Sequence, residues 1–395
     1  MIRWPRALVL LAALVFAATG VLVAQTRATQ PGDPLAGISA AEFEEFRLGL
    51  DDFLEVETAE EGLGPAFNGT SCAACHSVPA VGGMSAIAEV RAGRLTADGR
   101  YEGLDASGET LVHLFSLPGH ACQPVIPADA NIIIRRIPIP VFGAGLVEAI
   151  ADDTLLALAD PDDRNGDGVS GRAAIVTDRG TGDRRVGRFG WKAQHATLLA
   201  FSGDAYRNEM GITNDLFRDE LAVGVDATRM KVCDPLPDTE DIPDPLTRRR
   251  GIDNFASFMR LLAPPERAAG DEATREGERV FAAIGCAACH VPALTTAESR
   301  HPLFDRRSVA LFSDLLLHDV ATGDGIRQAS AGHDEIRTPA LWGVRHRRPL
   351  LHDGSAATIA DAILRHGGEA GRARAGYDRL GDEARAVLLR FLNAL

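Results

Sequence analysis

Two short motifs in this chain combine the residue types that attach a haem covalently. Residues 72–76 and 286–290 both read C-A-A-C-H. Two thiols at this spacing can each bond to one vinyl group of a haem, and the histidine that follows is then placed to bind the iron. A zinc site or a redox-active thiol pair could use such cysteines, but neither needs a histidine after both pairs. The motifs therefore predict two c-type haems, held by Cys72, Cys75, Cys286 and Cys289, with His76 and His290 as iron ligands.

Two cysteines remain, Cys122 and Cys233. Whether they are free thiols or form a disulfide depends on the compartment in which the protein folds. Arg3 and Arg6 precede an uncharged stretch over residues 7–26, which is typical of an export signal cleaved near residue 24 or 28. The stretch is also nearly long enough to remain as a membrane anchor. Either arrangement places the rest of the chain in the periplasm, where thiols oxidise, so we expect a Cys122–Cys233 disulfide.

The composition indicates a folded and acidic protein. The chain has 395 residues, of which 46% are hydrophobic, and this length allows two or three domains with cores of their own. Its 41 Lys and Arg residues against 55 Asp and Glu residues give a net charge of −14. Because this charge repels a phosphate backbone, we expect no nucleic-acid partner.

The sequences around the motifs predict the elements that hold them. Ser39 and Glu42 form a capping-box pattern before apolar residues at helical spacing. An amphipathic stretch, residues 276–281, leads into the second motif, and residues 382–395 carry apolar side chains at helical spacing. Residues 131–141 are β-branched and interrupted by prolines, which predicts an extended segment or an edge strand.

These elements favour a mainly α-helical fold of two cytochrome c-like haem domains, with the boundary at Pro264-Pro265. We expect a signal peptide or N-terminal membrane anchor over residues 1–28, an N-terminal haem domain over 29–265 and a C-terminal cytochrome c-like domain over 266–395. About 210 residues separate the two motifs, which is more than one cytochrome domain requires. The N-terminal domain is therefore expected to be enlarged by loop-rich insertions with a few short strands.

Several longer stretches resemble a known family. They include FNGTSCAACH ending at His76, ADPDDRNGDGVSGR from Ala159, GRFGWKA from Gly187, NEMGIT from Asn208 and LHDGSAATIADAILRHGGEA from Leu351. Over nearly the whole exported chain the sequence resembles the bacterial di-haem oxidoreductases, which are described as peroxidases or as thiol oxidoreductase-like. It is more distantly similar to di-haem cytochrome c peroxidases and to MauG. The resemblance implies an enzyme that uses hydrogen peroxide or another small oxidant and receives electrons from a soluble cytochrome c or cupredoxin.

The resemblance also implies roles for single residues near the first haem. Glu209, directly before Met210, falls on the pattern of the acid–base catalyst of the peroxidases, and Trp191 resembles the tryptophan between their two haems. A carboxyl group near the iron can deliver a proton to the departing oxygen of peroxide. The alternatives are a surface carboxylate at Glu209 and simple packing of Trp191. The glutamine that accompanies the catalytic glutamate in the peroxidases has no clear equivalent, since Gln194 lies further upstream.

The resemblance implies a distal ligand for the second haem. His366 falls where the peroxidases place the distal methionine, so we expect it to be the sixth ligand of that iron. Its rivals are His318, His333, His346 and His352. Near the first haem, no histidine lies at the spacing of the switching histidine of the peroxidases, which favours an open iron; the candidates are His113, His120 and His195.

A further short pattern matches the first half of a calcium loop. Asp163, Asn165 and Asp167 alternate and are followed by a glycine, as in loops whose oxygens converge on a cation. The acidic ligand expected at position twelve is absent, because that position is Ala174. Calcium bound with the help of other groups and a simple Asx turn both remain open.

Together these patterns predict an exported di-haem c-type oxidoreductase with peroxidase-like activity. The N-terminal haem would be the open reaction site, and the C-terminal haem would be the electron-transfer centre. Two alternatives remain: an electron-transfer cytochrome with both irons six-coordinate, and MauG-like oxidation of a protein or organic partner.

Overall fold

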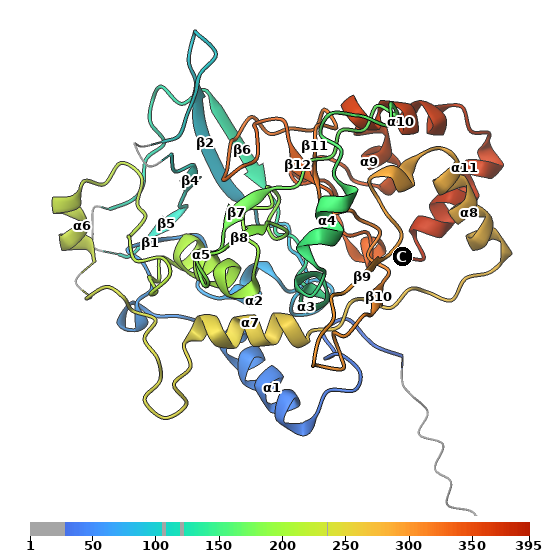
Figure 1. Cartoon of the computed structure of the whole chain (residues 1–395). Helices are drawn as coiled ribbons and strands as arrows, with labels where there is room; N and C mark the ends of the chain where they lie inside the picture. Colours follow the sequence, from blue (N-terminus) through green and yellow to red (C-terminus); the bar gives the residue numbers. More distant parts are fainter. Residues whose placement is uncertain (1–27, 105–107, 119–121, 235) are drawn as a thin grey trace, which may run out of the picture.

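The computed structural model of this chain describes residues 28–104, 108–118, 122–234 and 236–395 (Figure 1). The predicted export signal or anchor lies outside these residues except for its last position, so it stays a prediction. In the described part of the chain, no helix combines the length and the hydropathy needed to cross a bilayer.

Helices from distant parts of the sequence surround the first motif. Helix α1 begins with the expected capping box, in which Ser39 accepts a hydrogen bond from the Glu42 amide, and it packs against α7. The close approach of α1 and α7 requires Gly49, because a Cβ at that position would lie 2.3 Å from the Asn254 carbonyl oxygen. The N-terminal helices are α1 (Ala40–Leu54), α2 (Cys72–Cys75), α3 (Ala144–Glu148), α4 (Asp152–Leu158), α5 (Leu198–Met210), α6 (Ala227–Cys233) and α7 (Gly251–Leu261), with a 3-10 turn η1 (Ala59–Glu61).

The second motif lies among the C-terminal helices, drawn in orange and red in Figure 1. Helix α8 packs against α11, and Gly277 lies at their crossing, where a Cβ would be 2.0 Å from the Val387 carbonyl oxygen. The two predicted helices of this region are therefore confirmed. The C-terminal elements are α8 (Glu272–Ala283), η2 (Cys286–Ala288), η3 (Val344–His346), α9 (Ile359–Arg365), η4 (Gly368–Ala370), α10 (Gly371–Asp378) and α11 (Asp382–Leu392).

The largest sheet is antiparallel and has β2 (Glu89–Leu95) at its centre. Strand β2 pairs with β3 (Tyr101–Glu102), β4 (Leu111–Val112) and β6 (Ile132–Arg136). Strand β6 lies within the predicted extended segment 131–141 and pairs with β2 alone among the described strands, so that prediction is confirmed. The remaining strands form two-stranded pairs: β1 (Ala66–Phe67) with β5 (Phe115–Ser116), β7 (Ile175–Thr177) with β8 (Arg184–Val186), β9 (Leu294–Thr295) with β10 (Ser308–Val309), and β11 (Leu317–His318) with β12 (Ile336–Arg337).

The expectation of a mainly α-helical fold is confirmed only in part. Helices make up 31% of the described residues, which is an ordinary share for a globular protein, and the described strands are short. Much of the chain is therefore loop, as the many glycines and prolines suggest. The division into two cytochrome c-like domains stays a prediction.

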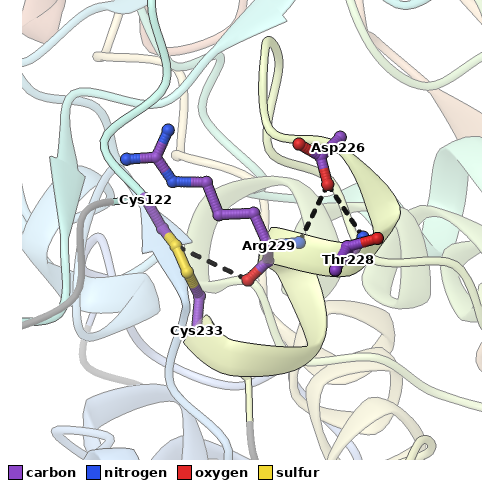
Figure 2. The surroundings of a disulfide bond; sticks show 5 residues. All are labelled: Cys122, Asp226, Thr228, Arg229 and Cys233. Carbon is purple, nitrogen blue, oxygen red and sulfur yellow. Dashed lines mark hydrogen bonds between the residues drawn. A yellow bond between two sulfur atoms is a disulfide. The ribbon is translucent and has the colours of Figure 1, made fainter.

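The predicted disulfide between Cys122 and Cys233 is present (Figure 2). The two Cα atoms lie 6.1 Å apart, and 111 residues separate the cysteines in sequence. Cys233 ends α6, and the N-cap residue of this helix is Asp226, whose side chain accepts hydrogen bonds from the Thr228 and Arg229 amides. The bond therefore ties α6 and the acidic loop after it to the segment before β6.

Candidate functional site

The second motif opens on a cavity of about 440 Å³ with mainly apolar walls. The motif residues Cys286, Cys289 and His290 line this cavity. It is also lined by His366, the C-cap residue of α9. The cavity volume lies within the range of roughly 300–1,000 Å³ that is typical of ligand pockets. The structure therefore brings the predicted proximal and distal histidines of the second haem into one cavity.

The two histidines of this cavity share one hydrogen-bonding arrangement. Nδ1 of His290 lies 3.1 Å from the Phe312 carbonyl oxygen, and Nδ1 of His366 lies 2.7 Å from the Ala362 carbonyl oxygen. Because a carbonyl can only accept, Nδ1 carries the proton in both rings, and Nε2 is the nitrogen that remains for an iron. Burial, and then the proximity of His366, lower the pKa of His290 to about 4, so its ring stays neutral, as a ligand must be.

The rival histidines are placed differently. His318 uses both ring nitrogens, with Nε2 at 2.9 Å from Asp314 Oδ2 and Nδ1 at 2.8 Å from Glu369 Oε2. A ring held by two carboxylates in this way has no nitrogen left for a metal. His333 is half-exposed beside Asp334, and His352 lines the cavity with its ring edge-on to Trp191.

The first motif opens on a smaller cavity of about 170 Å³. Cys72, Cys75 and His76 line it, and His76 repeats the arrangement of the second site, with Nδ1 donating to the Gly83 carbonyl oxygen at 2.9 Å. Phe53 at the end of α1 packs edge-on against the His76 ring, with the ring centroids 6.2 Å apart. A ligand of haem size held here needs the lining side chains to move, because the cavity is below the usual volume for such ligands.

Among the described residues that line the first cavity, His76 is the only histidine. His113 donates through Nε2 to the Asn208 carbonyl oxygen at 2.8 Å, and His195 lies 2.8 Å from Asp204 Oδ2. Neither lines the cavity. The third candidate, His120, lies outside the described residues. This first cavity therefore differs from the second, where two histidines stand together.

Glu209, near the end of α5, lines the first cavity. Its Oε2 accepts a hydrogen bond from Asn68 Nδ2 at 2.9 Å, so the alternative of a surface carboxylate does not describe its position. Burial, and then the negative charge of Glu89, raise the pKa of Glu209 well above that of an ordinary glutamic acid. The side chain is therefore held in its protonated, proton-donating form near neutral pH.

Four charged residues of the first cavity were not found from the sequence: Glu89, Arg91, Arg136 and Asp204. Glu89 and Arg91 lie two residues apart on β2, and Arg136 is directly opposite Glu89 on β6. Arg91 holds Glu89 through two hydrogen bonds, from Nε at 2.7 Å and from Nη2 at 3.0 Å. Charged residues at positions 89 and 91 would lie on the same face of a strand, which is a local signal in the sequence. Arg136, however, lies 47 residues after Glu89, and only the pairing of β2 with β6 brings these two residues together.

The position of Gln194 differs from what its place in the sequence suggests. It was placed too far upstream to accompany Glu209, yet the turn after Trp191 brings it into the lining of the same cavity. Its Oε1 accepts a hydrogen bond from the Lys192 amide at 3.3 Å. The spacing along the chain was misleading because the 190–197 segment folds back onto α5, with Phe189 and His195 paired across the turn.

Trp191 lines both cavities. Its Nε1 donates to the Ile137 carbonyl oxygen at 2.8 Å, and its backbone carbonyl accepts from the Arg337 amide, so both ends of the residue are fixed. The ring contacts His352 on the side of the second cavity, with centroids 6.1 Å apart. The indole is therefore rigidly placed where the two cavities approach each other.

The pattern at Asp163, Asn165 and Asp167 forms two Asx turns, at Asn165 and Asp167, and a longer-range side-chain hydrogen bond at Asp163. Asp163 accepts from the Gly168 amide, Asn165 from the Asp167 amide and Asp167 from the Val169 amide, at 2.8–3.2 Å. Arg372 of α10 binds the Asp167 carbonyl oxygen, so this loop contacts the rim of the second cavity. These bonds give the loop its shape, and calcium there stays a prediction.

Two buried arginine atoms indicate that both cavities are built for an anionic ligand. Nη2 of Arg136 in the first cavity and Nε of Arg347 in the second are buried and have no hydrogen-bond partner among the described residues. Buried polar atoms are nearly always hydrogen-bonded in folded proteins. The two propionate groups of a haem carry the acceptors that these atoms lack, so the residues present fit a haem at each motif.

A family model described as "Di-haem oxidoreductase, putative peroxidase" matches residues 125–395, which include the second motif and Glu209 but not the first motif. No curated protein matches the chain.

The solved structures that this chain resembles are distant from it in sequence. A hydrazine synthase from Kuenenia stuttgartiensis is 17% identical, with 94% of this chain and 97% of that chain covered and a TM-score of 0.43. A MauG-like protein associated with microbial copper homeostasis is 19% identical over 71% of this chain and 95% of that chain, with a TM-score of 0.34. The diheme peroxidase BthA from Burkholderia thailandensis is 15% identical over 52% of this chain and 65% of that chain, with a TM-score of 0.32.

Proposed function

This chain belongs to the di-haem oxidoreductase family, and from that premise we propose that it is a peroxidase-like enzyme whose reaction site is the first cavity. The observation that carries the proposal is the position of Glu209. A protonated carboxyl group and the motif histidine His76 line one cavity, and no second histidine lines it among the described residues.

In this proposal each motif binds one haem covalently. Cys72 and Cys75 hold the first haem and His76 binds its iron; Cys286 and Cys289 hold the second, with His290 and His366 as its two iron ligands. A haem with one open coordination position supplies the redox chemistry of peroxide reduction. Arg136 and Arg347 would provide hydrogen-bond donors for the propionates of the two haems.

The protein residues then determine where the reaction takes place. Glu209 delivers a proton at the first cavity, where a small oxidant can enter. In the second cavity His366 would bind the iron at the position that a small ligand needs, so small ligands would be excluded there. Trp191, which lines both cavities, provides a route for electrons from the second haem to the first. A soluble cytochrome c or a cupredoxin is the electron donor that this arrangement suits.

The proposal includes export to the periplasm. The Cys122–Cys233 disulfide supports it, because such bonds form and persist in oxidising compartments. The N-terminal residues have the pattern of an export signal, which also supports this location.

Glu209→Gln tests the proposed function. The substitution keeps the size of the side chain but removes the proton, so we expect the rate of reaction with hydrogen peroxide to fall by about 10²–10⁴-fold. The measurement is stopped-flow absorbance of the haem-loaded protein, with the matched control Glu57→Gln, whose carboxyl group is buried nearby but does not line the cavity. An unchanged rate in Glu209→Gln would refute the assignment of this cavity as a peroxidase site.

A further inference from the structure

Glu89 is a second carboxyl group beside Glu209, and neither the motifs nor the family pattern gives it a role. It is the first residue of β2, and Glu209 is the penultimate residue of α5. Both side chains line the first cavity, where burial, and then the negative charge of Glu89, raise the pKa of Glu209. Two carboxyl groups that line one buried cavity cannot both be ionised without a large penalty, so one of them is favoured to keep its proton.

The surrounding charges decide which of the two carboxyl groups is ionised. Glu89 accepts hydrogen bonds from Nε and Nη2 of Arg91 and lies 4.0 Å from Arg136 Nη1, whereas Glu209 accepts from a neutral donor, Asn68. Burial opposes ionisation of Glu89, but the charge of Arg91 and its hydrogen bonds outweigh burial and lower the pKa of Glu89. The negative charge therefore resides on Glu89 and the proton on Glu209.

The other charged groups around the pair are already engaged. They are Glu109, 4.0 Å from Arg91, Asp324, paired with Arg136, and Asp204, paired with His195. Asp324 also pairs with Lys192 at 3.1 Å, so the far side of Arg136 is neutralised by a buried network. The cations next to the pair therefore act chiefly on Glu89.

We propose that Glu89 is a positioning residue that keeps Glu209 protonated, so that the two carboxyl groups share one proton and act as a single acid–base unit. This inference rests on the proposed function for its role in turnover. In each cycle one proton leaves Glu209 for an oxygen atom of the bound oxidant, and one proton from water restores the pair. The carboxylate of Glu89 supplies the hydrogen-bond acceptor that aligns the Glu209 hydroxyl.

The test is infrared difference spectroscopy of the haem-loaded protein, which records the C=O absorption of protonated carboxyl groups as the pH is raised. Glu57 and Glu220 are other buried carboxyl groups with raised pKa values, so only the part of the signal that disappears in Glu209→Gln belongs to Glu209. In Glu89→Gln the neighbouring negative charge is gone and Arg91 faces Glu209. We expect the Glu209 signal to titrate lower by on the order of one pH unit or more.

Glu89→Asp is the matched conservative variant, because it keeps the charge with a shorter side chain. It should return the titration of Glu209 toward that of the unchanged protein and restore part of the peroxide rate lost in Glu89→Gln. An unshifted Glu209 signal in Glu89→Gln would overturn the inference, and so would equal titration of the two Glu89 variants.

The infrared result is independent of turnover, so the two proposals fail separately. If Glu209→Gln slows the peroxide reaction while Glu89→Gln leaves both the rate and the titration unchanged, the shared proton is refuted and the proposed function stands. If the titration shifts but neither variant changes the peroxide rate, the proton is shared and the cavity is not a peroxidase site. Haem content and circular dichroism of each variant establish that it is folded.

Discussion

The two C-A-A-C-H motifs are identical in sequence, but the cavities around them differ in what accompanies the motif histidine. In the second cavity His290 stands with His366, and both rings have Nδ1 bound to a carbonyl so that both keep Nε2 for a metal. In the first cavity His76 has the same ring arrangement, but a carboxyl pair and Gln194 take the place of a second histidine. In the proposed function the motif would attach the haem, and residues from distant elements would determine whether a site is closed or reactive.

The largest expected effect comes from abolishing this difference. His366→Ala removes the second histidine of the C-terminal cavity and should leave the second iron open, so the reduced protein should bind two equivalents of carbon monoxide in place of one. Optical titration with carbon monoxide measures the number directly. A variant that still binds one equivalent would show that another residue closes the second iron.

His318→Phe tests whether His318 is a structural residue of the second cavity and not the iron ligand. Burial opposes protonation of His318. Its hydrogen bonds, of which the one to Asp314 contributes most, nevertheless raise the pKa of His318 to about 12, so the ring is a cation at neutral pH. The substitution leaves Asp314 and Glu369 as buried anions without their partner, and we expect a loss of about 3–5 kcal/mol in the free energy of unfolding.

Denaturant unfolding measures this loss, with His333→Phe as the control. His333 is half-exposed, and its replacement should change stability by less than about 0.5 kcal/mol. The carbon monoxide stoichiometry of His318→Phe should stay that of the unchanged protein. A gain of a carbon monoxide site in this variant would mean that His318, and not His366, is the ligand.

The smallest effect concerns the buried acid behind the first cavity. Glu57 accepts a hydrogen bond from the Tyr206 hydroxyl at 2.7 Å, and burial raises its pKa to about 7 from the usual 4.5. The folded state therefore holds a proton that the unfolded state releases, so the stability that Glu57 contributes is complete below pH 4.5 and is lost as the pH rises through about 7.

Glu57→Gln should flatten this decline and leave the variant more stable than the unchanged protein at pH 8, by on the order of 1–3 kcal/mol. Unfolding midpoints measured from pH 4 to 8 check the slope. The exposed Glu60→Gln should reproduce the slope of the unchanged protein. Parallel pH curves for Glu57→Gln and the unchanged protein would contradict the placement of this carboxyl group.

The sequence predicted what local pattern can encode. The capping box at Ser39, the helix before the second motif and the extended segment that contains Ile132–Arg136 all depend on residues within one element, and all three are confirmed. The Cys122–Cys233 disulfide was predictable because only two cysteines remained after the motifs were assigned.

The parts that were missed depend on contacts between elements far apart in the chain. Glu89 could not be joined to Glu209 because 120 residues separate them and the strand that carries Glu89 was not recognised. The sequence favoured His366 over His318 as a ligand only through the resemblance. What sets His318 apart in the structure is Asp314 and Glu369 at the ring nitrogens of His318, which local sequence does not reveal. Gln194 was misplaced because a turn shortens its distance to α5 in space but not in sequence.

The contrast between one open and one closed iron is tested most directly on the purified, haem-loaded protein by electron paramagnetic resonance of the ferric form, together with carbon monoxide titration after reduction. The account predicts one high-spin and one low-spin ferric haem, and carbon monoxide binding at a single site. Two low-spin signals, with no carbon monoxide binding in the fully or half-reduced protein, would contradict it and indicate an electron carrier.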